Sequence, residues 1–563
     1  MASSDKNFPH FEATANSKQL YVDGKPYLIL GAELQNSSMS SAEYMKPIWP
    51  RLVDMNINTI LGNVTWEQIE PEEDKFDFEE LDNAIRDARH YGIRLVLLWF
   101  GSFKNGLSTY IPSWVKTNPK RFPRVQLRKA GGLLKTADIV SLFHEETRNA
   151  DAKAFAAFMR HLKEVDGEQK TVIMVQVENE VGVIGDSRDA GPGANKAFSA
   201  EVPKALIDHL SSDWDNLHAD LKANLKPFKA LTTKSGNWEQ VFGKDSQQTD
   251  ELFMAYHYAK FLDYVAQAGR EEYPLPLFTN VWLNNEGEDR DGSFPMATGG
   301  GTPGHYPSGG PLPNVLDIWQ AFAPTFEFIG PDIYLADYEK ICAKYRHRNQ
   351  PLLIPEQRSD EYGARRVWKA FGCYQAIGTC PFGIDTVTKE KDAFTKHYHL
   401  LSQIRFHILE AQRTPGSSYG FFFDELVSDG RDPTPPMVTN FGDWEVTISR
   451  SFVFGRPGSG AGMIIQLAPA KFLLTGFGFQ CKWRNTSPKS IFTGLLSYTE
   501  QIGDVKSGKL RPGRKLNGDE SESGKLCIMP NEKPDNGDFP IPMCMPAGTM
   551  IAECEVYSLE ADE

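Results

Sequence analysis

Eight short apolar segments recur along the first 410 residues, and they restrict the possible folds more than any other feature. Each is continuously apolar rather than alternating, which is typical of parallel strands covered on both faces. Segments with helical periodicity separate them, such as the one with Leu81, Ala84, Ile85 and Ala88 on one helix face. The runs cover residues 27–32, 58–63, 94–100, 171–177, 276–281, 326–334, 351–356 and 379–385. They predict an α/β fold, a (β/α)8 TIM barrel over residues 1–410, with an open doubly wound sheet as the alternative.

Residues 411–563 predict a smaller second domain. This part is rich in Gly and Pro and lacks a long amphipathic helix, and turn signals separate its strand-like runs. The runs cover residues 419–423, 444–448, 463–467, 472–477, 492–498 and 550–557. We therefore expect an antiparallel, sandwich-like β domain, with the domain boundary between residues 410 and 411.

The charge of the chain makes polyanionic partners unfavourable. Its 60 Lys and Arg residues against 74 Asp and Glu residues give a formal net charge of −14. Such a surface repels phosphate backbones and anionic membranes, so we expect neither nucleic acid nor membrane as a partner. The oligomeric state is left open by the sequence.

Known cofactor and metal motifs are missing. No G-x-G-x-x-G follows the first strand, and no P-loop, H-E-x-x-H or paired C-x-x-C motif occurs. We expect no cofactor and no metal. Seven unpatterned Cys residues and the lack of a secretory leader favour a cytoplasmic protein, the alternative being a periplasmic or secreted protein whose signal peptide has been removed.

Carboxylates end two of the predicted strands. Glu178 and Glu180 flank Asn179 after the fourth apolar run, and Glu356 ends the seventh. In a barrel the carboxyl ends of the strands face the substrate, so these groups would meet across the mouth. Two opposed carboxylates are what glycoside hydrolysis requires. Strand alternation predicts that Glu178 and Glu180 share a face, although the rule weakens where a strand frays.

Two segments resemble a known family. Residues 176–182 (QVENEVG) resemble the Q-x-E-N-E-[YF]-G signature of family 35 glycoside hydrolases, which are β-galactosidases of a large retaining (β/α)8 clan. Residues 66–78 (WEQIEPEEDKFDF) look like the family's segment after its second strand. Val181 replaces the usual aromatic residue. The resemblance extends over about residues 15–400.

The resemblance implies roles for individual residues. Glu180 would be the general acid/base, Glu356 the nucleophile, and Asn179 a ligand of the sugar 2-hydroxyl. Glu178 would support the site, or merely pack. Further candidate substrate contacts lie at or just after the ends of predicted strands. They are Asn105, Tyr334, Asn280, Trp282 and Trp66. The alternatives to a substrate contact at these positions are a loop turn, a core position or a salt bridge.

The function that follows from the resemblance is a retaining, exo-acting hydrolase that releases terminal β-D-galactose. Plant cell-wall oligosaccharides such as xyloglucan fragments are the expected natural substrates. One alternative is a glycosidase of the same clan acting on another terminal β-sugar. The other is a non-catalytic sugar-binding protein on the same barrel, against which the presence of both Glu180 and Glu356 counts.

Overall fold

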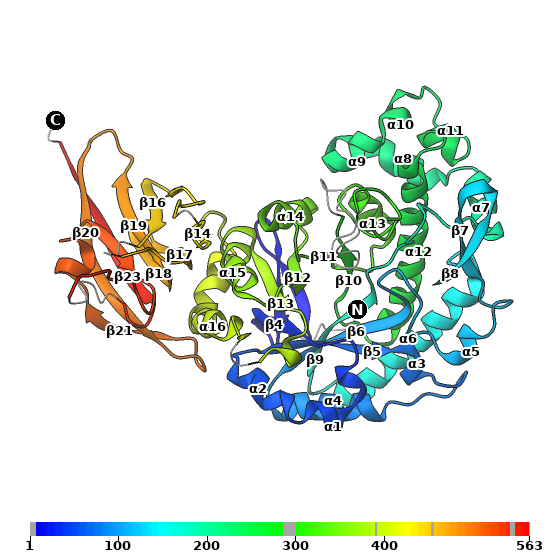
Figure 1. Ribbon diagram of the computed structural model, residues 1–563, viewed down its shortest axis with the longest axis horizontal. Helices are drawn as coiled ribbons and strands as arrows, with labels where there is room; N and C mark the ends of the chain where they lie inside the picture. Colours follow the sequence, from blue (N-terminus) through cyan, green and yellow to red (C-terminus); the bar gives the residue numbers. More distant parts are fainter. Residues whose placement is uncertain are drawn as a thin grey trace.

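The chain folds into a barrel with surrounding helices and a separate pair of antiparallel sheets (Figure 1). This computed structural model describes residues 7–284, 300–388, 391–428, 430–451, 455–540 and 547–561. Among them, no helix combines the length and the apolar character needed to cross a bilayer.

The eight expected strands form one parallel sheet that closes on itself. In spatial order they are β4 (Ile29–Glu33), β5 (Thr59–Thr65), β6 (Arg94–Lys104), β9 (Val172–Asn179), β10 (Leu277–Trp282), β11 (Phe328–Asp332), β12 (Leu352–Gln357) and β13 (Ala376–Pro381). A parallel bridge between Ile333 and Gln357 joins β11 to β12 and completes the ring. The predicted TIM barrel is confirmed, although its last strand begins at Ala376 rather than Thr379.

A small antiparallel sheet covers the amino-terminal end of the barrel. It consists of β1 (His10–Ala13), β2 (Lys18–Val22) and β3 (Lys25–Pro26). Leu20 and Val22 belong to the same buried cluster as the barrel residues Ile29, Leu61 and Phe278. Because this end is filled with side chains, a substrate must enter at the opposite end, where the strands finish.

Helices surround the barrel and supply the rest of its core. The long helices α6 (Glu145–Asp166) and α12 (Gln247–Glu272) pack against each other beside β6 and β9 (Figure 1). A hairpin of β7 (Arg124–Arg128) and β8 (Leu134–Val140) follows β6. The other helices are α1 (Ala42–Met45), α2 (Ile48–Asp54), α3 (Trp66–Ile69), α4 (Glu79–His90), α5 (Ser113–Lys116), α7 (Pro192–Ser199), α8 (Lys204–Ser212), α9 (Ala219–Asn224), α10 (Lys226–Ala230), α11 (Trp238–Phe242), α13 (Leu316–Phe322), α14 (Tyr338–Tyr345), α15 (Glu361–Tyr374) and α16 (Phe394–Ala411).

The carboxyl-terminal part is an antiparallel sandwich, as predicted. One sheet has the order β14 (Ser418–Phe423), β17 (Gly460–Ala468), β18 (Lys471–Phe477), β23 (Ile551–Glu560), β20 (Ser490–Gly503) and β21 (Leu510–Lys515). The other has β15 (Met437–Phe441), β16 (Trp444–Arg450), β19 (Phe479–Asn485) and β22 (Leu526–Met529). Gly478, with φ +74°, lets the chain pass from β18 to β19 and so change sheets.

The sandwich sits directly on helix α15. A Cβ atom at Gly420 in β14 would lie 1.8 Å from the carbonyl oxygen of Trp368, so only glycine allows this approach. Arg366 adds an ion pair to Asp424 at 2.8 Å. The expected boundary at residue 410/411 falls within the last turn of α16 and stays a prediction.

Candidate active site

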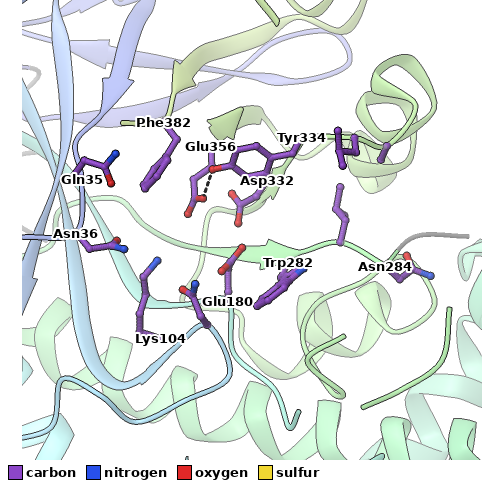
Figure 2. Close-up of a pocket in the computed structure, with 14 residues that line it drawn as sticks. Gln35, Asn36, Lys104, Glu180, Trp282, Asn284, Asp332, Tyr334, Glu356 and Phe382 are labelled. Carbon is purple, nitrogen blue, oxygen red and sulfur yellow. Dashed lines mark hydrogen bonds between the residues drawn. The ribbon is translucent and has the colours of Figure 1, made fainter. Parts of the chain in front are cut away.

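A cavity of about 340 Å³ opens at the carboxyl-terminal end of the barrel (Figure 2). Its walls come from the ends of β4, β6, β9, β10, β11, β12 and β13. The lining residues are Gln35, Asn36, Lys104, Asn105, Glu180, Trp282, Leu283, Asn284, Asp332, Tyr334, Leu335, Ala336, Glu356 and Phe382. The cavity therefore lies where a barrel enzyme binds its substrate.

The end of β9 is strained, and this strain separates Glu178 from Glu180. Both residues have left-handed backbones, with φ +60° and +46°, which non-glycine residues adopt only when the surroundings hold them. Glu180 reaches the cavity, whereas Glu178 is fully buried and does not line it. The expectation that the two share a face is therefore wrong, because strand alternation fails at these dihedral angles.

Glu178 braces the neighbouring strand. Its carboxylate accepts hydrogen bonds from the backbone amides of Ser102 at 3.1 Å and Phe103 at 2.6 Å. Burial, and next the charge of Asp151, raises its pKa well above the ordinary value. These contacts fix the end of β6, from which Lys104 enters the cavity.

Glu180 and Glu356 face each other across the cavity. Oxygen atoms of Glu180, Asp332 and Glu356 all lie within 4.8 Å of one another. In retaining glycosidases the two catalytic carboxyl groups are about 5–5.5 Å apart, against roughly 6.5–9.5 Å in inverting ones. The oxygen atoms of Glu180 and Glu356 thus approach each other more closely than the longer of these two separations. Among the described residues, these three carboxylates are also the group close enough to share a metal ion.

Three donors hold Glu356 in place. The Tyr334 hydroxyl donates to Oε2 at 2.7 Å, and the amides of Asn179 and Asn280 donate to Oε1 at 3.4 and 3.3 Å. Glu356 is 5% exposed, so these contacts decide its orientation. A carboxylate held in one position by several donors suits a nucleophile.

Asn280 connects all three carboxylate-bearing segments. Its Oδ1 accepts the backbone N–H of Glu180 at 2.9 Å, and its Nδ2 donates to Asp332 Oδ2 at 2.8 Å as well as to Glu356. The side chain is fully buried. Asn280 therefore acts on the site from behind the cavity wall.

The electrostatics give Glu180 the properties of a general acid. Burial, and then the charge of Glu356, raises the pKa of Glu180 to about 8. Burial alone would lower the pKa of Lys104, but the charges of Glu356 and Glu180 outweigh it and raise that pKa. Lys104 therefore stays cationic, with its amine donating to Asn179 Oδ1 at 2.9 Å. At neutral pH, Glu180 holds a proton that it can give to a leaving group.

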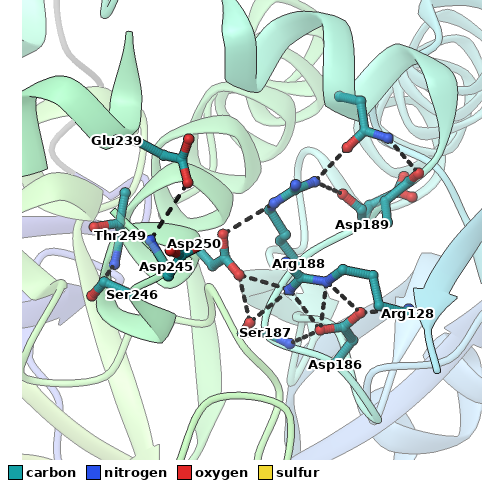
Figure 3. Close-up of polar contacts among 12 residues, drawn as sticks. Arg128, Asp186, Ser187, Arg188, Asp189, Glu239, Asp245, Ser246, Thr249 and Asp250 are labelled. Carbon is teal, nitrogen blue, oxygen red and sulfur yellow. Dashed lines mark hydrogen bonds and ion pairs between the residues drawn. The ribbon is translucent and has the colours of Figure 1, made fainter. Parts of the chain in front are cut away.

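The loop after Glu180 is anchored by a second group of charges (Figure 3). We call Arg128, Asp186, Arg188 and Asp250 the arginine cluster. Arg128 Nη2 pairs with Asp186 and with Asp250, both at 2.7 Å, and Arg188 Nε pairs with Asp250 at 3.0 Å. The β7–β8 hairpin and α12 thus hold the chain six residues beyond Glu180.

Most of the predicted residues meet at the cavity. Asn105, Trp282 and Tyr334 line it, while Asn179 and Asn280 contact Glu356 from beneath. Trp66 does not take part, since it is fully buried and its indole donates to Glu70 at 2.8 Å. The prediction of Trp66 as a substrate contact is corrected on this ground, because its side chain follows helix α3 into the core.

Nine lining residues were not singled out from the sequence. Each lies near the end of a predicted strand or follows it, which was the signal available. They are Gln35, Asn36, Lys104, Leu283, Asn284, Asp332, Leu335, Ala336 and Phe382. Of these, Lys104 and Asp332 carry charge and change the chemistry of the site most.

A family comparison agrees with the geometry. Residues 40–240 match the family model of the β-galactosidases of glycoside hydrolase family 42. The chain is a glycoside hydrolase. The match is to family 42 and not to family 35, so the resemblance is supported for the shared clan. Residues 394–527 of the hydrolase match a model described as a domain of unknown function, DUF5597.

Other comparisons describe more distant likenesses of this hydrolase. No curated protein matches it. The catalytic domain of a β-amylase from Paenibacillus polymyxa aligns with 11% identity over 66% of this chain and 97% of that one, with a TM-score of 0.46. β-Galactosidases from Marinomonas ef1 and Bacillus circulans sp. alkalophilus align with 12% and 14% identity over 69% and 68% of this chain, with TM-scores of 0.43 and 0.42. The hydrolase spans 62% and 57% of the length of these two β-galactosidases.

Proposed function

We propose that the hydrolase is a retaining, exo-acting β-galactosidase. The observation that carries this proposal is the pair Glu180 and Glu356, whose oxygens face each other within 4.8 Å in a cavity at the barrel mouth. The match of residues 40–240 to a β-galactosidase family supports galactose as the sugar that is released.

The reaction is a double displacement. In the first step a carboxylate oxygen of Glu356 attacks the anomeric carbon, the bond from that carbon to the glycosidic oxygen breaks, and Glu180 gives its proton to the leaving oxygen. In the second step Glu180 takes a proton from water. The water oxygen bonds to the anomeric carbon, and Glu356 leaves as a carboxylate. The β configuration is retained after two inversions.

Neighbouring residues position the sugar and the nucleophile. Tyr334 and Asn280 keep the Glu356 carboxylate oriented toward the anomeric carbon. Trp282 offers an indole at the cavity wall for the apolar face of galactose, and Asn105 offers an amide for a hydroxyl. For Asn179, which contacts Lys104 and Glu356, we propose a hydrogen bond to the 2-hydroxyl. We do not propose sugar contacts for Glu178 or Trp66.

The shape of the cavity supports exo action. Its volume is about 340 Å³, and buried apolar side chains of the described residues fill the barrel beneath it. One terminal sugar fits at the bottom while the rest of the substrate extends outward. For that outer part we propose plant cell-wall oligosaccharides such as xyloglucan fragments, which are neutral and compatible with an acidic protein surface.

We also propose a cytoplasmic location. Its support is that the six described cysteines carry free thiols, five of them buried. Cys481 and Cys527 stand opposite each other on paired strands and remain reduced. Free neighbouring thiols are typical of a reducing compartment.

A panel of 4-nitrophenyl β-D-glycosides tests the function. We expect the galactoside to be hydrolysed faster than the glucoside, glucosaminide, arabinoside and fucoside, with β-galactose as the first product seen by NMR. Glu356→Gln should abolish turnover. A first product of inverted configuration, or preference for another sugar, contradicts the mechanism or the specificity respectively. Release of galactose from xyloglucan fragments tests the proposed natural substrate.

A further inference from the structure

Asp332 is a third acidic side chain in the cavity, and the double displacement does not use it. It ends β11, lines the cavity and is only 4% exposed. In Figure 2 its carboxyl group lies beside that of Glu356 and above that of Glu180. Among the described residues Asp332 has no ion pair of its own, and a buried carboxylate beside two others is costly and needs an explanation.

The two oxygens of Asp332 have different surroundings. Oδ2 accepts a hydrogen bond from Asn280 Nδ2 at 2.8 Å. Oδ1 is buried, and no N–H or O–H donor among the described residues reaches it. The nearby ammonium group of Lys104 is directed to Asn179 Oδ1 instead. The carboxyl group of Glu180 has an oxygen within 4.8 Å of an oxygen of Asp332, and it becomes an acceptor when it ionises in catalysis.

Two acceptor oxygens that face each other in a buried site require a proton between them. We propose that Asp332 stays protonated and donates a hydrogen bond from Oδ1 to the carboxyl group of Glu180. Asp332 is then a positioning residue that acts through the general acid/base. This inference rests on the proposed role of Glu180 in glycoside hydrolysis.

The environment of Asp332 favours its neutral form. Burial, and next the charges of Glu356, Glu180 and Glu33, raises its pKa well above the ordinary value. The contact with Asp332 lowers the pKa of Glu180, which is the direction expected when Asp332 donates and Glu180 accepts. The ionisable groups that face Asp332 come from β4, β6, β9, β12 and the end of β11, and they are Glu33, Lys104, Glu180, Glu356 and Tyr334.

A protonated Asp332 helps both steps of catalysis. Glu180 becomes a carboxylate when it protonates the leaving oxygen, and the Asp332 O–H then stabilises this new charge inside a dry cavity. When water attacks, Glu180 regains a proton and the Asp332 O–H remains in place. Asp332 neither gives up its proton nor forms a bond to the sugar, so the balance of the double displacement is unchanged.

The isosteric amide separates this proposal from its alternative. In Asp332→Asn, the amide nitrogen replaces the O–H as donor to Glu180, while the amide oxygen still accepts from Asn280. We expect Asp332→Asn to keep kcat/KM within roughly threefold of the wild type. Asp332→Ala removes the donor and should lower kcat by roughly 10²-fold. The loss should be larger for poor leaving groups, which depend most on acid catalysis, than for 2,4-dinitrophenyl galactoside.

If Asp332 is instead ionised, its charge is what matters. Asp332→Asn would then be as damaging as Asp332→Ala, and the basic limb of its pH profile would move to lower pH. That result overturns the proposal. A loss in Asp332→Ala that is equal for good and poor leaving groups also overturns it, since it would indicate a structural role only.

Infrared spectroscopy tests protonation without relying on turnover. At pH 7 we expect the wild type to show a carboxylic acid C=O band that disappears in Asp332→Asn and persists in Glu356→Gln. A wild-type minus Asp332→Asn spectrum with only a carboxylate band contradicts the proposal even if the enzyme is a β-galactosidase. Conversely, failure of every glycoside in the panel would refute the proposed function while the acid band still reported on Asp332.

Discussion

Two groups of charged side chains meet the loop that follows β9, one at Glu180 and the other at Asp186 and Arg188, and they are balanced in opposite ways. At the cavity, the carboxyl groups of Glu33, Glu180, Asp332 and Glu356 share one cation, Lys104. We call these four the carboxylate cluster. In the arginine cluster, two guanidinium groups face two carboxylates in paired contacts of 2.7–3.0 Å. Five residues lie between Glu180 and Asp186 in the sequence.

The difference appears in the protons that the carboxyl groups hold. Burial alone would raise the pKa of Asp186, but its hydrogen bonds with Arg128 outweigh burial and lower that pKa. In the carboxylate cluster, burial and mutual repulsion act in the same direction and raise the pKa of Glu180 and Asp332. Paired carboxylates give rigidity, whereas crowded ones retain protons for chemistry.

The sharpest test of this contrast is Glu356→Gln in the carboxylate cluster. The amide cannot attack the anomeric carbon, so we expect kcat/KM to fall by roughly 10⁴-fold or more. The free energy of unfolding should stay the same or rise, because one of several crowded acids is neutralised. Initial rates and denaturant unfolding measure the two effects. If Glu356→Gln instead lowers the free energy of unfolding, Glu356 stabilises the fold as the arginine cluster does.

The opposite result is expected for Arg188→Met in the arginine cluster. Arg188 and Asp250 are mostly buried, and Arg188→Met removes one of the two guanidinium groups that pair with Asp250. Because Arg128 keeps its pair with Asp250, we expect the free energy of unfolding to fall by about 1.5–3 kcal/mol. At temperatures where the variant is folded, kcat/KM should fall less than tenfold. Denaturant unfolding monitored by barrel tryptophans checks the first effect, and unchanged stability would contradict the assigned role.

The sequence predicts the barrel well because its signal is local. Continuous apolar runs mark strands that are buried on both faces, and the eight runs correspond to β4 through β13 of the ring. Glu180 and Glu356 could also be predicted from the sequence, since the end of a barrel strand points at the substrate. Asn280 and Tyr334 followed from the same rule.

Other parts of the site depend on geometry that no local pattern carries. The left-handed backbone of Glu178 turns this residue away from the cavity. The neighbouring residues in the sequence do not predict this positive φ angle. Asp332 ends a predicted strand like the others, but its proximity to Glu180 needs the register of β10 and β11. The arginine cluster joins residues 128, 186 and 250, which only the tertiary fold brings together.

The pH dependence of activity sharpens the comparison further. Glu180 must be protonated in the first step, and its pKa is about 8. We therefore expect kcat/KM to fall about tenfold per pH unit above pH 8. The matched control is a substrate whose leaving group needs no acid, such as 2,4-dinitrophenyl galactoside. For this substrate kcat/KM should not fall above pH 8. If kcat/KM falls above pH 8 for both substrates, the titration of a group other than Glu180 causes the fall.

The same group links stability to pH with a defined sign. The folded pKa of Glu180 lies above the unfolded value of about 4.3. Its contribution to stability is therefore complete below pH 4.3 and is lost as the pH rises through about 8. Glu180→Gln cannot ionise, so this variant should lose less stability than the wild type between pH 5 and pH 8. Thermal unfolding across this range measures the difference, and identical curves would contradict the raised pKa.

The smallest effect is expected where charges pair without burial. Lys204 and Asp208 form an ion pair on helix α8, with side chains 86% and 58% exposed. Water screens such a pair, so Lys204→Ala should change the free energy of unfolding by only about 0.3–0.5 kcal/mol, and less at high salt. Denaturant unfolding beside Arg188→Met gives the comparison on one scale. A loss from Lys204→Ala as large as that from Arg188→Met would mean that burial does not decide which charge pairs stabilise this protein.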